Sequence, residues 1–259
     1  SVKSIMGQHY ALHDGEHANV ALAIEEQYLP RFAGDRLPTS STGYILSLAE
    51  KLDTLVGIFG IGKLPKGDKD PFALRRSAIG ILRIMVENKL ALDIHSMVKS
   101  VVSIYADRLS NAQTATQVHT FLLDRFKPLY QDQDITGDVV SAVMTQQPTT
   151  AIDFDARIRA VTAFKQMDSA VDLVAANKRV ANMLNKNDID IDALPSIDPS
   201  LFIEDAEKAL FFALQSAQSE VSRLINTLAY DEMLSSLAFL RSPLNHFFNS
   251  VMLMSDHEK

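Results

Sequence analysis

Apolar residues recur at helical spacing along almost the whole chain, and this feature limits the fold most. In residues 44–62 the apolar stripe is Ile45, Leu48, Leu52, Leu55 and Val56. In residues 17–29 it is Val20, Ile24 and Tyr28. No segment shows the sustained apolar and polar alternation that a half-buried strand needs. The pattern therefore predicts an all-α fold.

Proline and glycine mark the ends of the predicted helices. The first long helix stops at Pro30 and the next stops at Gly60. A further helix runs to about residue 90, with Asp70 as a good N-cap and Pro71 suited to the first helical position.

The chain has 259 residues, enough for two domains with cores of their own. Residues 1–95 have a net charge near zero, whereas residues 147–259 have about −6. We therefore expect two helical domains joined by a helical connector over residues 96–146. Residues 148–155 are interpreted as a hinge, and residues 187–200 as an acidic loop.

Composition excludes several classes of function. The chain has no cysteine, which rules out a thiolate nucleophile or a zinc–thiolate site and favours the cytoplasm. The net charge of −7 argues against a generally basic nucleic-acid coat. No stretch approaches the roughly 18 apolar residues of a membrane helix. Phosphate-binding glycine loops, HExxH and GxSxG are also absent.

Two groups of polar residues have metal-ligand or acid–base spacing. His9, His13 and His17 are spaced by four, but a glycine interrupts the segment, so solvated histidines are the better interpretation than a metal site. Glu50 and Asp53 are three apart on a predicted helix. They suit a ligand or acid–base pair, but ion pairs with arginines of the next helix are favoured.

Arginines cluster at the start of that next helix, where the helix dipole already favours anions. Arg76, Gly80 and Arg83 share one face, and Gly80 leaves a gap that would let a bulky group approach the backbone. Together with Arg75 they predict a phosphate-contacting surface. The alternative is an ion-pair network with Glu50 and Asp53.

One basic cluster stands out in the acidic second domain and predicts contact with an RNA backbone. Its candidate residues are Lys178, Arg179, Lys186 and Arg241. Phe247 and Phe248 lie near Arg241 in sequence and suit base stacking, although core packing is the commoner role at this spacing.

Several stretches resemble the β subunit of bacterial tetrameric glycyl-tRNA synthetase. The most specific is "AEKLDTLVGIFGIGKLPKGDKDPFALRRSAIGILRI", and "IMGQHYALHDGE", "AANKRVANML" and "LAFLRSPLNHFFNSVMLM" extend the likeness over the chain. The resemblance implies a C-terminal fragment that lacks the N-terminal region and the extreme C-terminus. Residues 1–95 resemble the later half of an HD-like helical domain. Residues 147–259 resemble a DALR-type anticodon-binding bundle.

The resemblance also implies an α2β2 glycine–tRNA ligase that acts in protein biosynthesis. Its α subunit would carry the catalytic site with ATP and magnesium, and its β subunit would bind and position tRNA-Gly. The implied partners of this chain are tRNA-Gly and the α subunit, with no DNA and no membrane. We expect no catalytic residue, metal or cofactor within the chain itself.

Comparison with active HD phosphohydrolases weakens an alternative assignment to that enzyme class. Their histidine pair falls at Gln27 and Tyr28, and their last metal-ligand aspartate falls at Glu50. Glutamine and tyrosine are poor substitutes for imidazole in such a site. Two alternatives to tRNA binding remain open. One is a metal-dependent HD phosphohydrolase, and the other is a scaffold that serves only subunit assembly.

Overall fold

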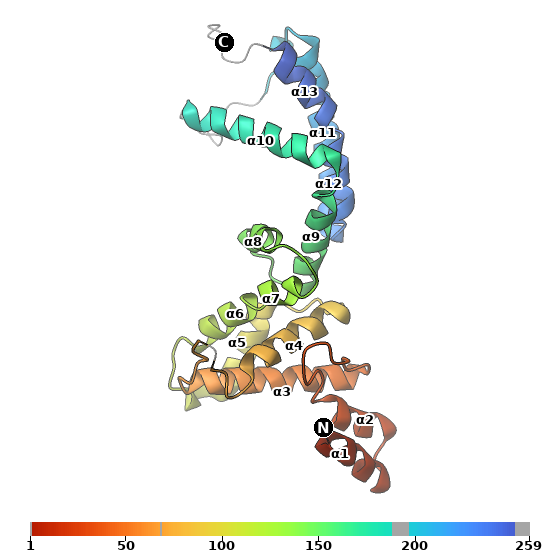
Figure 1. The fold of residues 1–259 in the computed structure, drawn as a ribbon, viewed down its shortest axis with the longest axis vertical. Coiled ribbons are helices and arrows are strands. Elements are labelled where there is room, and N and C mark those ends of the chain that lie inside the picture. Colours follow the sequence, from red (N-terminus) through yellow and green to blue (C-terminus); the bar gives the residue numbers. More distant parts are fainter. Residues whose placement is uncertain (1, 68, 188–196, 252–259) are drawn as a thin grey trace. The chain divides into compact units, whose positions relative to one another are not determined.

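The computed structural model describes residues 2–67, 69–187 and 197–251. Every regular element in these ranges is a helix, which confirms the all-α prediction (Figure 1). The chain divides into two compact units, residues 1–155 and 156–259, called unit 1 and unit 2 below. Most of the predicted acidic loop lies outside the described residues.

Unit 1 is organised around helix α3. Its helices are α1 Val2–His13, α2 Ala18–Glu26, α3 Ser41–Gly60, α4 Leu74–Glu87, α5 Ile94–Tyr105, α6 Thr114–Leu123, α7 Phe126–Gln131, α8 Gly137–Thr145 and the start of α9 Ala151–Phe164. Helices α2, α4, α5 and α6 all pack against α3. Helices α5 to α8, which lie largely in the predicted connector, thus belong to unit 1. The domain limits at residues 95 and 147 stay predictions.

The predicted apolar stripe of α3 is buried except at its start. Leu48, Leu52, Leu55 and Val56 are at most 5% exposed. The inclusion of Ile45 was wrong, since it is 61% exposed. The first turns of α3 instead bury small or polar residues, Gly43, Ser47 and Lys51. Val20 and Tyr28, predicted as core, are also more than 40% exposed.

Helix α4 begins later than its predicted start at Pro71. Ala73 adopts the left-handed conformation, with φ of 54°, and the helix follows from Leu74. Asp70 caps it from further back, because its carboxylate accepts hydrogen bonds from the Leu74 and Arg75 amides at 2.8 and 2.9 Å. The prediction was therefore wrong about the position of the N-cap, which is Ala73, although the Asp70 side chain does satisfy the first amides of the helix.

An aromatic cluster fixes the end of unit 1. The rings of Phe126 and Phe154 stack with centroids 3.8 Å apart, and Tyr130 lies parallel to Phe154 at 6.0 Å. Phe154 lies in α9, so the hinge predicted over residues 148–155 is wrong from Ala151 onward. Burial of these rings outweighs the polar, proline-containing character of the preceding segment.

The described part of unit 2 contains the rest of α9, four further α-helices and two short 3-10 helices, Pro199–Leu201 and Ile225–Thr227. The further α-helices are α10 Asp168–Lys186, α11 Asp205–Leu224, α12 Tyr230–Ala238 and α13 Arg241–Ser250. Helix α11 packs against α12 and α13, and α10 also contacts both. A reciprocal capping box between Glu204 and Glu207 fixes the start of α11. The C-terminal end of α10 lies apart from the other helices of this unit (Figure 1).

Candidate nucleic-acid interface

The α4 arginines bind backbone carbonyls rather than the carboxylates of α3. Arg75 donates to the Gly67 carbonyl, and Arg76 donates to the Arg31 carbonyl at 3.3 Å. Arg83 donates to the Asp35 carbonyl at 3.0 Å and pairs with Glu87 at 2.9 Å. The expected ion-pair network with α3 is therefore wrong.

Glu50 and Asp53 have other partners. Asp53 accepts a hydrogen bond from the Tyr105 hydroxyl at 2.8 Å. A Glu50 oxygen lies 4.0 Å from the Lys51 ammonium nitrogen. The two carboxylates therefore serve different neighbours, and they do not act as one pair.

Gly80 is in close contact with other parts of unit 1. A Cβ atom at Gly80 would lie 3.2 Å from a Pro30 side-chain carbon and 3.3 Å from Cε of Lys51. Pro30 and Lys51 therefore occupy one side of the glycine, but Gly80 also lines an open pocket with both arginines, so the expected gap is present beside it. This pocket has a volume of about 220 Å³, and Arg76, Gly80 and Arg83 line it together with Phe32.

The segment that these arginines bind is held by two buried carboxylates. Asp35 accepts from the Arg31 amide and side chain at 2.9 and 2.8 Å. The hydrogen bond from the Arg31 side chain is the main reason that the pKa of Asp35 falls to about 2. Glu26 accepts from the amide and hydroxyl groups of Thr39 and Ser40. Burial opposes ionisation of Glu26, but these hydrogen bonds outweigh it and lower its pKa.

Lys51 is a central polar residue that sequence reasoning missed. It is only 4% exposed, and its ammonium donates to the Leu29 carbonyl and the Ser47 hydroxyl, both at 2.9 Å. Burial lowers its pKa, while nearby Glu50 acts in the opposite direction. The residues next to Lys51 in the sequence do not indicate that its ammonium group would be buried. They also do not indicate that it would bind the carbonyls of the Gln27–Pro30 turn.

The positions compared with HD phosphohydrolases have local structural roles. Gln27 donates its side-chain amide to the Ile24 carbonyl at 3.0 Å, and Tyr28 is 41% exposed. His17 lies outside α1 and caps α2 by accepting from the Asn19 amide at 3.2 Å, so it does not continue the face of His9 and His13. Within the described ranges, no three acidic or histidine side chains are grouped as metal ligands.

The four basic candidates of unit 2 divide into two pairs. The Arg179 guanidinium lies over the Phe248 ring at 4.3 Å, and Arg241 forms an ion pair with Asp172. Lys178 and Lys186 are exposed and have no partner in the part of the chain that the structure describes. The two lysines are therefore the freer cations of α10.

Phe247 and Phe248 are half-buried, with ring centroids 5.7 Å apart in an edge-to-face arrangement. This is less burial than a core role predicts. Phe248 supports Arg179, so a basic side chain from α10 and an aromatic ring from α13 lie on one surface.

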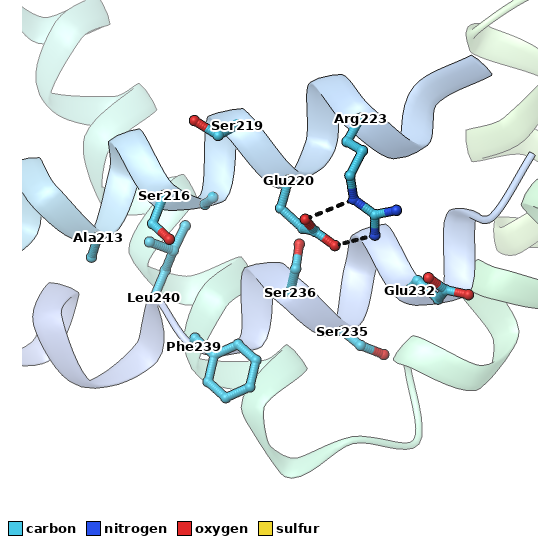
Figure 2. A pocket seen from close by; sticks show the side chains of 11 residues that line it. Ala213, Ser216, Ser219, Glu220, Arg223, Glu232, Ser235, Ser236, Phe239 and Leu240 are labelled. Carbon is cyan, nitrogen blue, oxygen red and sulfur yellow. Dashed lines mark hydrogen bonds and ion pairs between the residues drawn. The ribbon is translucent and has the colours of Figure 1, made fainter. Parts of the chain in front are cut away.

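A groove between α11 and α12 is the second feature that sequence reasoning missed. Its volume is about 790 Å³, and serines and alanines line much of it. Figure 2 shows Glu220 and Arg223 paired along one side, at 2.6 Å, with Phe239 and Leu240 at the other end. Phe239 is 82% exposed. Ala213, Ser216 and Glu220 have the helical spacing that places them on one face, and this was the available signal.

Comparison with known proteins shows which family the sequence of this chain matches. Residues 1–145 match the family described as glycyl-tRNA synthetase beta subunit, and residues 173–259 match the DALR anticodon binding domain. The chain belongs to the glycyl-tRNA synthetase β-subunit family. None of the helices in the described ranges is long and apolar enough to cross a membrane.

Individual relatives agree with this placement. The glycine–tRNA ligase β subunit of Alteromonas mediterranea is 52% identical over 257 residues, which is 99% of this chain and 37% of that protein. The β subunit of Aeromonas salmonicida is 50% identical over 258 residues, 100% of this chain and 37% of the relative. That of Pseudoalteromonas translucida is 49% identical over 257 residues, with 99% and 37% covered. The chain thus spans about 37% of the length of these relatives.

Proposed function

We propose that this chain is the part of a glycine–tRNA ligase β subunit that binds and positions tRNA-Gly. Glycylation would take place at the α subunit, which would hold ATP and magnesium. The observation that carries the proposal is the match of residues 173–259 to an anticodon binding domain, in a unit whose α10 exposes two lysines without a partner in the described ranges. The absence of cysteine supports a cytoplasmic location for this assembly.

In this proposal Lys178 and Lys186 contact RNA phosphates, since both are exposed and free of intramolecular partners in the described residues. Arg179 and Arg241 shape the same surface through Phe248 and Asp172. A local basic rim suffices in an acidic unit, because unpaired anticodon bases are recognised by stacking and hydrogen bonds as well as by charge.

The arginines of α4 have a different role in the proposal. Arg75, Arg76 and Arg83 already donate to backbone carbonyls, so their main contribution is to hold loops of unit 1. Arg76 keeps an exposed guanidinium with donors to spare for a phosphate.

The proposal is tested by filter binding with the full-length β subunit assembled with its α subunit. The ligands are tRNA-Gly and a transcript with a changed anticodon, each at two salt concentrations. We expect preferential, salt-sensitive binding of tRNA-Gly, weakened about tenfold by Lys178→Ala combined with Lys186→Ala. The matched control is Lys165→Ala with Lys208→Ala, two other lysines of unit 2.

Equal affinity for both transcripts, unchanged by the α10 variant, would contradict the proposal. Retained α-subunit association in that case would favour the assembly scaffold. Phosphohydrolase activity that depends on added divalent metal would favour the HD alternative.

A further inference from the structure

The turn between α3 and α4 is rich in basic residues. Residues 62–76 contain five basic and two acidic residues, in a chain whose overall charge is −7. Lys63, Lys66 and Lys69 are exposed and have no partner among the residues with described positions. Asp70 is occupied by the first amides of α4, so its acceptors face the helix backbone.

Two of these lysines are held directly opposite each other. Lys66 and Lys69 form an isolated antiparallel bridge, with the Lys69 amide 3.0 Å from the Lys66 carbonyl oxygen. Residues opposite each other in such a pair have Cβ atoms about 5 Å apart on the same face, and like charges there repel. An anionic ligand would relieve this repulsion.

The turn is fixed to the helix that follows it. The Arg75 guanidinium donates to the Gly67 carbonyl, and Gly67 has a positive φ of 52° that suits glycine. Arg75, predicted as a phosphate ligand, thus positions the segment that carries the lysines. Charges held in place before binding lose less conformational entropy on contact with a ligand.

A pocket of about 300 Å³ with both apolar and charged residues in its lining, Asp70 among them, lies beside these lysines. Lys63 and Lys66 line it together with Leu64, Pro65 and Phe72. Phe72 is 42% exposed, although it lies next to a turn that buries Leu74 almost completely. An accessible aromatic ring bordered by lysines is the combination that binds single-stranded nucleic acid, with bases on the ring and phosphates on the cations.

We propose that this pocket, called the Phe72 pocket, binds an unpaired RNA segment of the tRNA outside the anticodon arm. A base would stack on Phe72 while Lys63, Lys66 and Lys69 contact the adjoining phosphates. The inference rests on the proposed function, because it takes the tRNA to be the RNA that reaches unit 1. An acidic protein surface would engage the lysines without needing the ring.

The test measures binding of intact tRNA-Gly and of its isolated anticodon stem-loop to the full-length assembled protein. Replacing Lys63, Lys66 and Lys69 together by alanine is expected to weaken tRNA-Gly binding about tenfold or more. The slope of log affinity against log salt is expected to fall by about two, since each single-strand phosphate contact contributes roughly 0.7. Binding of the stem-loop should not change.

Phe72 is tested separately from charge. Phe72→Leu is expected to weaken tRNA-Gly binding about fivefold with no change of salt slope, and Phe72→Tyr should keep near-normal affinity because it retains the ring. The matched control replaces Lys3, Lys99 and Lys127 by alanine, three exposed lysines elsewhere in unit 1. That control should retain both affinity and salt slope.

Several outcomes would overturn the inference. One is unchanged tRNA affinity in the triple lysine variant, and another is an equal loss in the control triple. Weakened α-subunit association with normal tRNA binding would identify a protein contact instead. If the unmodified protein binds neither RNA, the proposed function itself fails, whereas loss confined to the α10 variants would leave that function intact and exclude the Phe72 pocket.

Discussion

In unit 1 the side chains of Leu55, Ile81 and Phe126 are fully buried, whereas alanines make up about half of the buried apolar residues described in unit 2, beside Ile158, Leu224, Tyr230 and Leu240. Ala170, Ala176, Ala206 and Ala217 are the buried residues of α10 and of α11 up to its last turn. An alanine removes much less apolar area from water than a leucine or phenylalanine does. Unit 1 therefore has the deeper core.

The two units both expose large apolar side chains, among them Phe32 and Phe72 in unit 1, but they differ in how they use basic ones. Phe212 and Phe239 of unit 2 are 64% and 82% exposed. Exposed aromatic residues near a groove are typical of contact surfaces. The basic residues of α4, by contrast, stabilise loops of unit 1. Arginines clustered at the start of a helix can therefore stabilise neighbouring loops of their own domain instead of binding a ligand.

The largest test of this comparison is a matched pair of phenylalanine substitutions. Phe126→Ala is expected to reduce the free energy of unfolding by about 3–5 kcal/mol, because it empties a buried site stacked on Phe154. Phe212→Ala, in unit 2, is expected to cost less than about 1 kcal/mol. Urea unfolding followed by circular dichroism measures both. Equal losses would contradict the difference between the cores.

A second test concerns the buried carboxylate that caps the entry to α3. Glu26→Gln replaces an acceptor of four hydrogen bonds by an amide whose NH2 faces donors, and we expect a loss of about 2 kcal/mol. Glu16→Gln, at an exposed position, is the control and should change stability little. A Glu26→Gln protein as stable as the control would show that the ordered segment before α3 does not depend on this carboxylate.

A third test uses pH. The pKa of Asp35 is lowered from 3.8 to about 2, so its contribution is present above pH 4 and lost as pH falls through 2. That contribution is about 2 kcal/mol, because one pKa unit corresponds to roughly 1.4 kcal/mol. Asp35→Asn should lose this much at pH 7 and show a flatter acid dependence between pH 4 and 2. If the free energy of unfolding of Asp35→Asn falls between pH 4 and 2 as steeply as that of the unmodified protein, other groups cause this pH dependence.

The smallest expected effect lies on the surface of unit 2. Arg241 and Asp172 are 48% and 36% exposed, so their ion pair is screened by solvent. A double-mutant cycle with Arg241→Ala and Asp172→Ala should give a coupling of about 0.2–1 kcal/mol, measured by thermal unfolding. A coupling above about 2 kcal/mol would mean that this exposed ion pair stabilises the protein as much as the buried carboxylates Glu26 and Asp35 of unit 1 are expected to.

Periodicity predicted the helices and most of the α3 core, since burial of Leu48, Leu52 and Leu55 follows from spacing alone. It failed where tertiary contacts decide the outcome. The left-handed Ala73 delays α4, although nothing in an alanine favours that conformation. Phe154 extends α9 backward because its ring stacks on Phe126, a contact that spacing does not reveal.

The basic clusters were found from the sequence, but their partners were not. Arg76 and Arg83 donate to backbone carbonyls more than 40 residues upstream. Every residue has such a carbonyl, so the residue type cannot indicate which one is bound. The Arg241 ion pair joins α13 to Asp172 of α10, a carboxylate 69 residues upstream that only the fold brings close. What remained after these pairings, Lys178 and Lys186, became identifiable only when the intramolecular contacts were known.

We propose that α10 of unit 2 contacts the anticodon arm of tRNA-Gly. Hydroxyl-radical footprinting of tRNA-Gly on the full-length assembled protein tests it most directly. We predict protection of the anticodon arm, lost when Lys178 and Lys186 are replaced by alanine and kept when Lys165 and Lys208 are. An anticodon arm that stays unprotected, or protection that survives the α10 substitutions, would contradict the account.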